Sequence, residues 1–265
     1  SYTLTNVGRF RVSIFRQRGN IGVVMRTIPH TIASFEELKL PPVLGRISQA
    51  SNGLVLVSGP TGNGKSTTLA SMIKFINDNF QYNIITIEDP IEFLFTSSKS
   101  CIIQREIGID TDSFSGAVRA AMRMNPDVIM VGEMRDLDTI DSCIKAAETG
   151  HLVFSTLHTH NAASTINRIV GYFPPDSQEN VRHRLADIIV ATVSIRLVRG
   201  KSDEGLIPVL EIMSATNTIK ACIRDNHLDE IEHHIEKGRD EYHMQSLDQH
   251  LVQLCKDDVI ALEEA

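Results

Sequence analysis

The sequence predicts an α/β fold built around a mainly parallel sheet. Two observations support this prediction. Short apolar runs alternate with longer amphipathic stretches from residue 53 onward, and a glycine-rich loop joins the first apolar run to the first amphipathic stretch. Strands that alternate with helices are typical of βαβ units, in which each helix returns the chain so that the next strand runs parallel. The 265 residues suffice for one large domain and part of a second.

The apolar runs predict strands, and the amphipathic stretches predict helices. We expect strands at 54–57, 83–87, 127–131 and 152–154, and helices near 67–79, 113–124, 136–148 and 161–170. The expected parts of the chain are the end of an N-terminal domain (1–30), a linker with a short helix (31–52), an α/β domain (53–213) and a helical C-terminal region (214–265).

The first residues predict a β-hairpin. Phe10, Val12 and Ile14 alternate with polar residues, which is the period of a half-buried strand. Gly19-Asn20 supplies the expected turn, and 21–26 the returning strand. Because the pattern starts within an element, we expect the beginning of this small domain to be absent.

The linker contains a helix signal. Ser34 followed by Glu37 forms a capping box, and Pro41-Pro42 is expected to end the short helix that follows it.

The composition argues against several classes of protein. The net charge of −7 and the pI of about 5.8 count against a nucleic-acid partner. The sequence has no apolar run of about 18 residues, so no membrane span is expected, and no secretory leader is recognised. No cysteine belongs to a C-x-x-C pair, so we expect reduced thiols rather than a zinc ribbon or redox dithiol at Cys101, Cys143, Cys222 and Cys255.

A glycine-rich loop predicts a nucleotide site. Its sequence fits G-x-x-x-x-G-K-[ST] and lies between an expected strand and an expected helix. Glycines let several backbone N–H groups point at phosphates, and the helix N-terminus adds a partial positive charge. Lys65 is expected to reach the β- and γ-phosphates, and Ser66 to coordinate Mg²⁺. The alternative is a turn that binds nothing. The expected ATP-binding residues here are Gly59, Pro60, Thr61, Gly62, Asn63, Gly64, Lys65, Ser66 and Thr67.

A second element predicts the catalytic acid. The apolar run 127–131 is followed by Gly132 and Glu133. P-loop enzymes need an acid at the end of a neighbouring strand, near the attacking water. We expect Glu133 to orient or deprotonate that water, although a strand that ends in Gly-Glu can also be an ordinary loop start.

Four motifs together resemble the secretion and pilus ATPase superfamily, and within it the PilT-like retraction ATPases of type IV pili. They are GPTGNGKSTT at 59–68, ITIEDPIEF at 85–93, NPDVIMVGEMRD at 125–136 and AAETGHLVFSTLHT at 146–159. The resemblance implies a RecA-like P-loop core, a small PAS-like α+β domain before it, ATP and Mg²⁺ as ligands, and a homo-hexameric ring.

The resemblance also implies roles for acids and histidines. Glu88 and Asp89 would face Mg²⁺, and Glu92 would join catalysis; the alternative is a solvated acidic turn. His158 would sense the γ-phosphate and His151 would bind the nucleotide, unless both are structural histidines.

Two arginines match family positions that reach the nucleotide of a neighbouring subunit. Arg11 and Arg26 lie on the two arms of the expected hairpin. A guanidinium stays charged and binds phosphate oxygens in a bidentate manner. The alternative is a solvated basic edge strand.

The function implied by the resemblance is ATP hydrolysis that powers retraction of a type IV pilus. The chain would work in the cytoplasm at the inner membrane, against the platform protein and pilus machinery, without nucleic acid. Alternatives are a pilus-extension or type II secretion ATPase, the type IV secretion branch, and a non-hydrolysing nucleotide switch. Extension ATPases typically carry C-x-x-C pairs, which this chain lacks. The segment 218–225, TIKACIRD, departs from the family motif AIRNLIRE, so its partner contacts are open.

Overall fold

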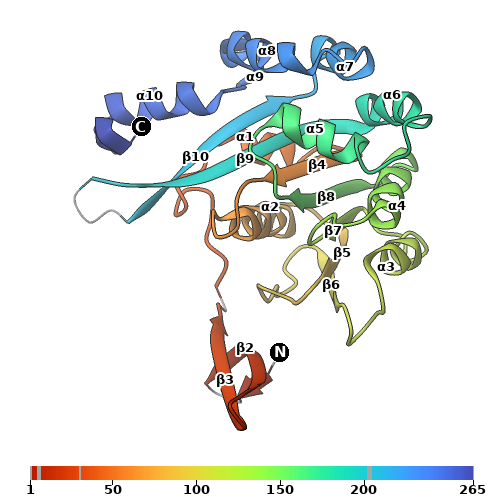
Figure 1. Cartoon of the computed structure of the whole chain (residues 1–265), viewed down its shortest axis with the longest axis vertical. Helices are drawn as coiled ribbons and strands as arrows, with labels where there is room; N and C mark the ends of the chain where they lie inside the picture. The colour runs from red at the N-terminus through yellow and green to blue at the C-terminus, as the bar shows by residue number, and fades with distance from the viewer. Residues whose placement is uncertain (1, 5–6, 30, 202–204, 265) are drawn as a thin grey trace.

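The computed structural model describes residues 2–4, 7–29, 31–201 and 205–264. Its centre is a seven-stranded sheet in the order β10-β9-β4-β8-β7-β5-β6 (Figure 1). All neighbouring strands pair in parallel except β9 and β10, which pair antiparallel. The predicted α/β fold with a mainly parallel sheet is therefore confirmed. The strands are β4 (Gly53–Ser58), β5 (Asn83–Glu88), β6 (Cys101–Glu106), β7 (Val128–Val131), β8 (Leu152–Leu157), β9 (Ile189–Arg199) and β10 (Leu206–Ser214).

Helices cover both faces of this sheet, and the strand pattern explains why. Side chains of a strand alternate between faces. Leu54 and Leu56 of β4 belong to one apolar cluster, and Val55 and Val57 belong to the other. The second cluster lies under α1 (Val43–Ile47) and α2 (Lys65–Asn79). The first lies under α3 (Phe114–Ala121), α4 (Leu137–Glu148), α5 (Ala162–Val170), α6 (Gln178–Ile188), α7 (Asn217–Arg224) and α8 (Ile231–Lys237).

The carboxyl ends of the central strands meet at one edge of the sheet. Ser58 at the end of β4 lies beside Leu157 at the end of β8, and Val131 at the end of β7 lies beside Ser155. Ile87 of β5 pairs with Val131 on the other side. The segments that follow these strands carry most of the expected site residues, and ligands of open α/β sheets bind at this edge.

The predicted hairpin forms, with a turn one residue earlier than expected. Strand β2 (Gly8–Gln17) pairs with β3 (Asn20–Ile28), and β1 (Tyr2–Leu4) adds a third strand. Arg18 and Gly19 make the turn with φ of 50° and 83°, so Asn20 already belongs to β3. Positive φ at both central residues is the geometry of a tight hairpin turn. The hairpin projects from the sheet domain (Figure 1).

The prediction of a short helix after Ser34 is wrong. The capping box does form, since Ser34 N donates to Glu37 Oε2 at 2.7 Å and Glu37 N donates to Ser34 Oγ at 3.2 Å. The segment 35–39 nevertheless contains only turns, and α1 starts after the proline pair with Pro42 at its N-cap. A proline is tolerated at a helix start, where its missing N–H has no partner to lose.

The end of the chain is helical, as expected. After α7 come η1 (Leu228–Glu230), α8, α9 (Arg239–Tyr242), α10 (Leu247–Lys256) and η2 (Leu262–Glu264). Strands β6, β9 and β10 and helix α6 were not among the predicted elements. Within the described ranges, no helix combines the length and apolarity that crossing a bilayer requires.

Candidate functional site

The predicted phosphate loop connects β4 to α2. Gly59, Gly62 and Gly64 adopt φ of 145°, 80° and 86°, which side chains disfavour. At Gly59 a Cβ atom would lie 2.3 Å from the carbonyl oxygen of Ile195. Asn63 fixes the loop on the same strand, because its Oδ1 accepts from Leu197 N at 2.9 Å. The loop is thus held against β9, which the sequence did not predict.

Lys65 lies buried at the start of α2 and binds the loop itself. Its Nζ donates to Gly59 O at 2.8 Å and to Pro60 O at 3.0 Å. Burial lowers the pKa of Lys65, and the negative charges of Glu133 and Glu92 act in the opposite direction. A buried cation whose closest partners are neutral carbonyl oxygens is well placed to exchange them for an anion.

The N-terminus of α2 presents unpaired donors to the same space. The N-cap is Gly64, which has no side chain with which to cap the helix. The first backbone N–H groups of a helix have no partner within it, and they carry partial positive charge. Ser66 and Thr67 line the cavity beside them. This arrangement fits a phosphate group.

Glu133 lies beside an arginine and a histidine. Arg135 forms an ion pair with Glu133 and a second one with Asp89, whose Oδ2 lies 3.3 Å from Arg135 Nη1. The Nε2 atom of His158 lies 3.5 Å from Glu133 Oε2. The other ring nitrogen of His158 is 3.4 Å from Lys65 Nζ. His158 therefore bridges the phosphate loop and the acid.

The acids of the second motif line the same cavity. Glu88 is buried, and its carboxylate accepts from Thr86 Oγ1 at 2.7 Å and from Gln104 Nε2 at 3.1 Å. Burial raises the pKa of Glu88. Asp89 and Glu92 come after Glu88 in the chain and also line the cavity. Acids gathered beside a phosphate site are costly without a cation between them, so they fit Mg²⁺.

Arg11 and Arg26 line the cavity of their own chain. The expectation that they reach the nucleotide of a neighbouring subunit stays a prediction. They lie directly opposite each other in the pairing of β2 with β3. Arg11 Nη1 is 3.9 Å from Glu92 Oε1. The hairpin thus lies over the carboxyl edge of the sheet, a position that spacing along the sequence does not predict.

His151 does not line this cavity. This corrects the expectation that it binds the nucleotide there. It precedes β8 and therefore lies at the amino edge of the sheet, opposite the phosphate loop. Its Nδ1 is 2.9 Å from Ala146 O and 3.2 Å from Thr149 Oγ1. The histidine closes the end of α4, which is a structural role.

The cavity has a volume of about 500 Å³, in the range of small-molecule sites. Of the expected site residues, thirteen line it: Arg11, Arg26, Thr61, Gly62, Gly64, Lys65, Ser66, Thr67, Glu88, Asp89, Glu92, Glu133 and His158. Gly59, Pro60 and Asn63 do not line it but hold the loop through their hydrogen bonds to Lys65 and Leu197. Sequence reasoning missed Arg135, although its position two residues after Glu133 in an acid-rich motif was a signal.

Comparison with known proteins places this site in a family. The family model described as type II/IV secretion system protein matches residues 5–260. The chain belongs to this family. It is 46% identical over its whole length to the twitching motility protein of Neisseria gonorrhoeae, covering 71% of that protein. It is 44% identical, again over its whole length, to the type IV pilus retractation ATPase PilT of Pseudomonas aeruginosa, covering 76%.

A solved structure of the family has the same fold. The crystal structure of the pilus retraction motor PilT with bound ADP superposes with a TM-score of 0.93 at 45% identity, over 99% of this chain and 74% of that one. The resemblance read from the four motifs is thereby confirmed, and the chain is a P-loop ATPase of this family.

Proposed function

We propose that this chain hydrolyses ATP to power the retraction of a type IV pilus. One observation carries the proposal: a single cavity gathers the phosphate loop, the acid Glu133 and two arginines from the hairpin. The full-length similarity to proteins named for twitching motility and pilus retraction supports the coupling to pili.

In the proposed mechanism the γ-phosphate replaces the loop carbonyls as the partner of Lys65. The first-turn N–H groups of α2 bind the remaining phosphate oxygens. Glu133 orients the attacking water and accepts its proton, while Arg135 and His158 fix the carboxylate. Arg11 and Arg26 bind the charge that develops on the transferred phosphoryl group. Loss of that charge after hydrolysis weakens the hold of the hairpin on the cavity, and this change moves the N-terminal domain.

Ser66, Glu88 and Asp89 would hold Mg²⁺, which supplies charge neutralisation between the phosphates and the acids when bound. Hard carboxylate and hydroxyl oxygens suit this ion, so the residues present fit it.

We further propose that the chain works as a homo-hexamer at the cytoplasmic face of the inner membrane, against the pilus platform protein. Support comes from apolar surface on one face of the hairpin, where Ile14 and Ile21 are each 70% exposed and Val23, which pairs with Ile14, is 53% exposed. Grouped apolar side chains on a surface are typical of contacts with another domain or subunit.

The arginines are expected to act on the nucleotide of their own subunit. Replacing Arg11 and Arg26 by alanine should lower kcat about 10- to 100-fold, because each loses a charge-assisted bond to the phosphoryl group. Steady-state phosphate release measures this. Mixed rings of this variant and Lys65→Ala should then recover no activity, since every subunit lacks one part of its own site.

Recovery of phosphate release in those mixed rings would mean that the arginines serve a neighbouring subunit. Arg16 and Arg18 at the hairpin tip provide the matched control, because neither lines the cavity. The Arg16→Ala, Arg18→Ala double variant should hydrolyse ATP at the rate of the unmodified protein.

Imaging of pili tests the function itself. Deletion of the gene in its own host should leave excess pili that extend but do not retract, and the unmodified gene should restore retraction. Bald cells would instead indicate the extension ATPase, and unchanged pili with impaired secretion would indicate a secretion ATPase. Complementation with Glu133→Gln should fail to restore retraction if hydrolysis is the source of force.

A further inference from the structure

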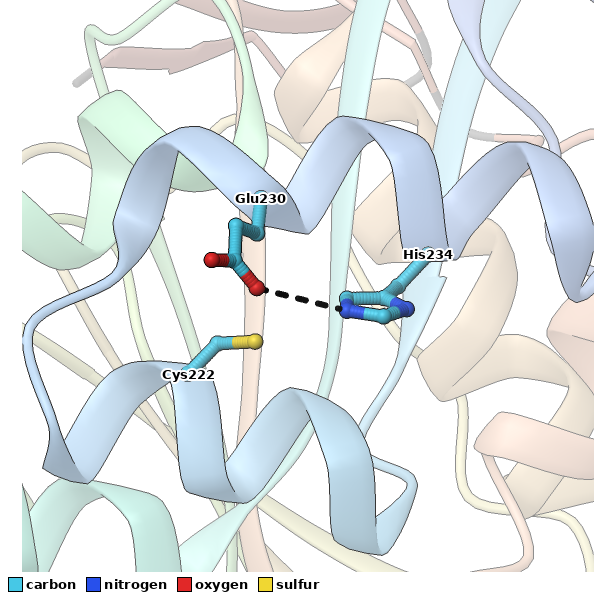
Figure 2. A group of neighbouring side chains, drawn as sticks. All are labelled: Cys222, Glu230 and His234. Atoms are coloured by element: carbon cyan, nitrogen blue, oxygen red, sulfur yellow. Dashed lines mark ion pairs between the residues drawn. The ribbon is translucent and has the colours of Figure 1, made fainter.

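Three side chains of metal-binding type converge outside the nucleotide site. Cys222 projects from α7, Glu230 lies at the end of η1 and His234 lies on α8, and the three point toward one another (Figure 2). The thiol, one carboxylate oxygen and one imidazole nitrogen all lie within 4.8 Å of one another. None of the three lines the nucleotide cavity.

The backbone beneath this cluster is firmly held. Ile219 and Ile223 of α7 and Ile231 and Ile235 of α8 are at most 1% exposed and belong to the core cluster on that face of the sheet. Cys222 is buried beside this stripe, one residue before Ile223. Glu230 and His234 are four residues apart, which places both on one helical face. Packing of the two helices therefore brings the thiol to the Glu–His pair.

We propose that Cys222, Glu230 and His234 form a binding site for one zinc ion. Zinc binds thiolate at about 2.3 Å and imidazole nitrogen at about 2.0 Å in a tetrahedron, so its ligand atoms lie about 3.5 Å apart. The Nε2 atom of His234 is already 3.8 Å from Glu230 Oε2. The thiol lies within 4.8 Å of both of these ligand atoms, so the three donors already surround the position that the ion would take.

The types of ligand atom indicate which metal ion the site would prefer. A thiolate excludes Mg²⁺ and Ca²⁺ as preferred occupants, and the mixed sulfur, nitrogen and oxygen set is typical of Zn²⁺. Asp225, Asp229 and Glu230 place negative charge near Cys222. That excess of negative charge is relieved by a divalent cation.

The fourth position of the ion faces solvent, because the Glu230 side chain is 55% exposed and that of His234 is 26% exposed. A water molecule completes the tetrahedron there. The ion would join α7 to α8 across the turn at 225–230 and so hold the two helices of the C-terminal region together. The site does not depend on the proposed pilus function.

Cobalt titration tests the site. Co²⁺ adopts zinc geometry and gives a thiolate-to-metal charge-transfer band, which the carboxylates of the nucleotide cavity cannot produce because that cavity has no lining cysteine. We expect the metal-free full chain to bind one Co²⁺ with this band and with visible bands of tetrahedral intensity, and one Zn²⁺ to abolish both. Competition with a zinc indicator dye then gives the affinity.

Variants locate the bound metal. Cys222→Ser should remove the charge-transfer band. His234→Gln should weaken zinc binding at least about tenfold, since even the loss of a group that only hydrogen-bonds to a metal ligand costs that much. Controls are Cys255→Ser and His233→Gln, which remove the same residue types outside the cluster and should bind zinc normally. A normal circular dichroism spectrum and normal ATP binding confirm that each variant folds.

Two results would overturn the proposal: absence of the charge-transfer band with equimolar Co²⁺, or persistence of the band in Cys222→Ser. A heat-denaturation series gives an independent measurement. Zinc should raise the melting temperature of the unmodified chain by a few degrees and leave that of Cys222→Ser unchanged, because a ligand stabilises only the state that binds it.

Discussion

Lys65→Ala is expected to lose nearly all ATP binding and hydrolysis. The ammonium group lies in the phosphate loop, where it donates to Gly59 O and Pro60 O, and among the described residues no other lysine lines the cavity. Charge-assisted bonds contribute about 1.5–3 kcal/mol each. Loss of two such bonds to the phosphates predicts a Kd for ATP raised about 10²- to 10⁴-fold. Equilibrium binding of a fluorescent ATP analogue measures the change.

Lys74→Ala is the matched control for this variant. Lys74 lies on the same helix, and its Nζ contacts Asp78 Oδ2 at 2.5 Å on the outer face, away from the cavity. Its removal should leave ATP affinity unchanged. The melting temperature of Lys65→Ala shows whether the loop stays folded without its bonds to the lysine. A folded Lys65→Ala protein that binds ATP normally would contradict the proposed phosphate site.

Glu133→Gln is expected to bind ATP normally and to hydrolyse it about 10²- to 10⁴-fold more slowly, which is the range for loss of a general base. The amide has nearly the same size and can still accept from Arg135, but it cannot take a proton from water. Single-turnover measurement of phosphate release isolates the chemical step from product release.

Asp138→Asn tests whether any loss of charge near this motif has the same effect. Asp138 is exposed in the first turn of α4 and does not line the cavity. We expect its hydrolysis rate to be that of the unmodified protein. Near-normal hydrolysis by Glu133→Gln would assign the base to another acid of the cavity, and Glu92→Gln would then be the variant to measure.

Patterns among neighbouring residues were sufficient to predict the central strand β4, the phosphate loop and the helix after it. The run of buried residues in β4, the glycine-rich loop and the helix that follows occupy consecutive positions, so spacing alone predicts their order. The strands β9 and β10 gave a weaker signal. Polar residues such as Ser194 and Glu211 are buried there, and Ser194 Oγ donates to Glu211 Oε1 at 3.0 Å. A sequence does not reveal that such groups are paired.

The sequence by itself determined the phosphate loop, the acid after β7 and the arginine pair on the hairpin, because each depends on neighbours along the chain. Only the tertiary structure decided that Arg11 and Arg26 face their own cavity, that His151 lies at the opposite edge of the sheet, and that Cys222 meets His234. These outcomes depend on the direction of the linker, on the edge at which a strand begins and on the packing of two helices. Each is set by contacts between residues far apart in sequence, which periodicity and motif spacing do not encode.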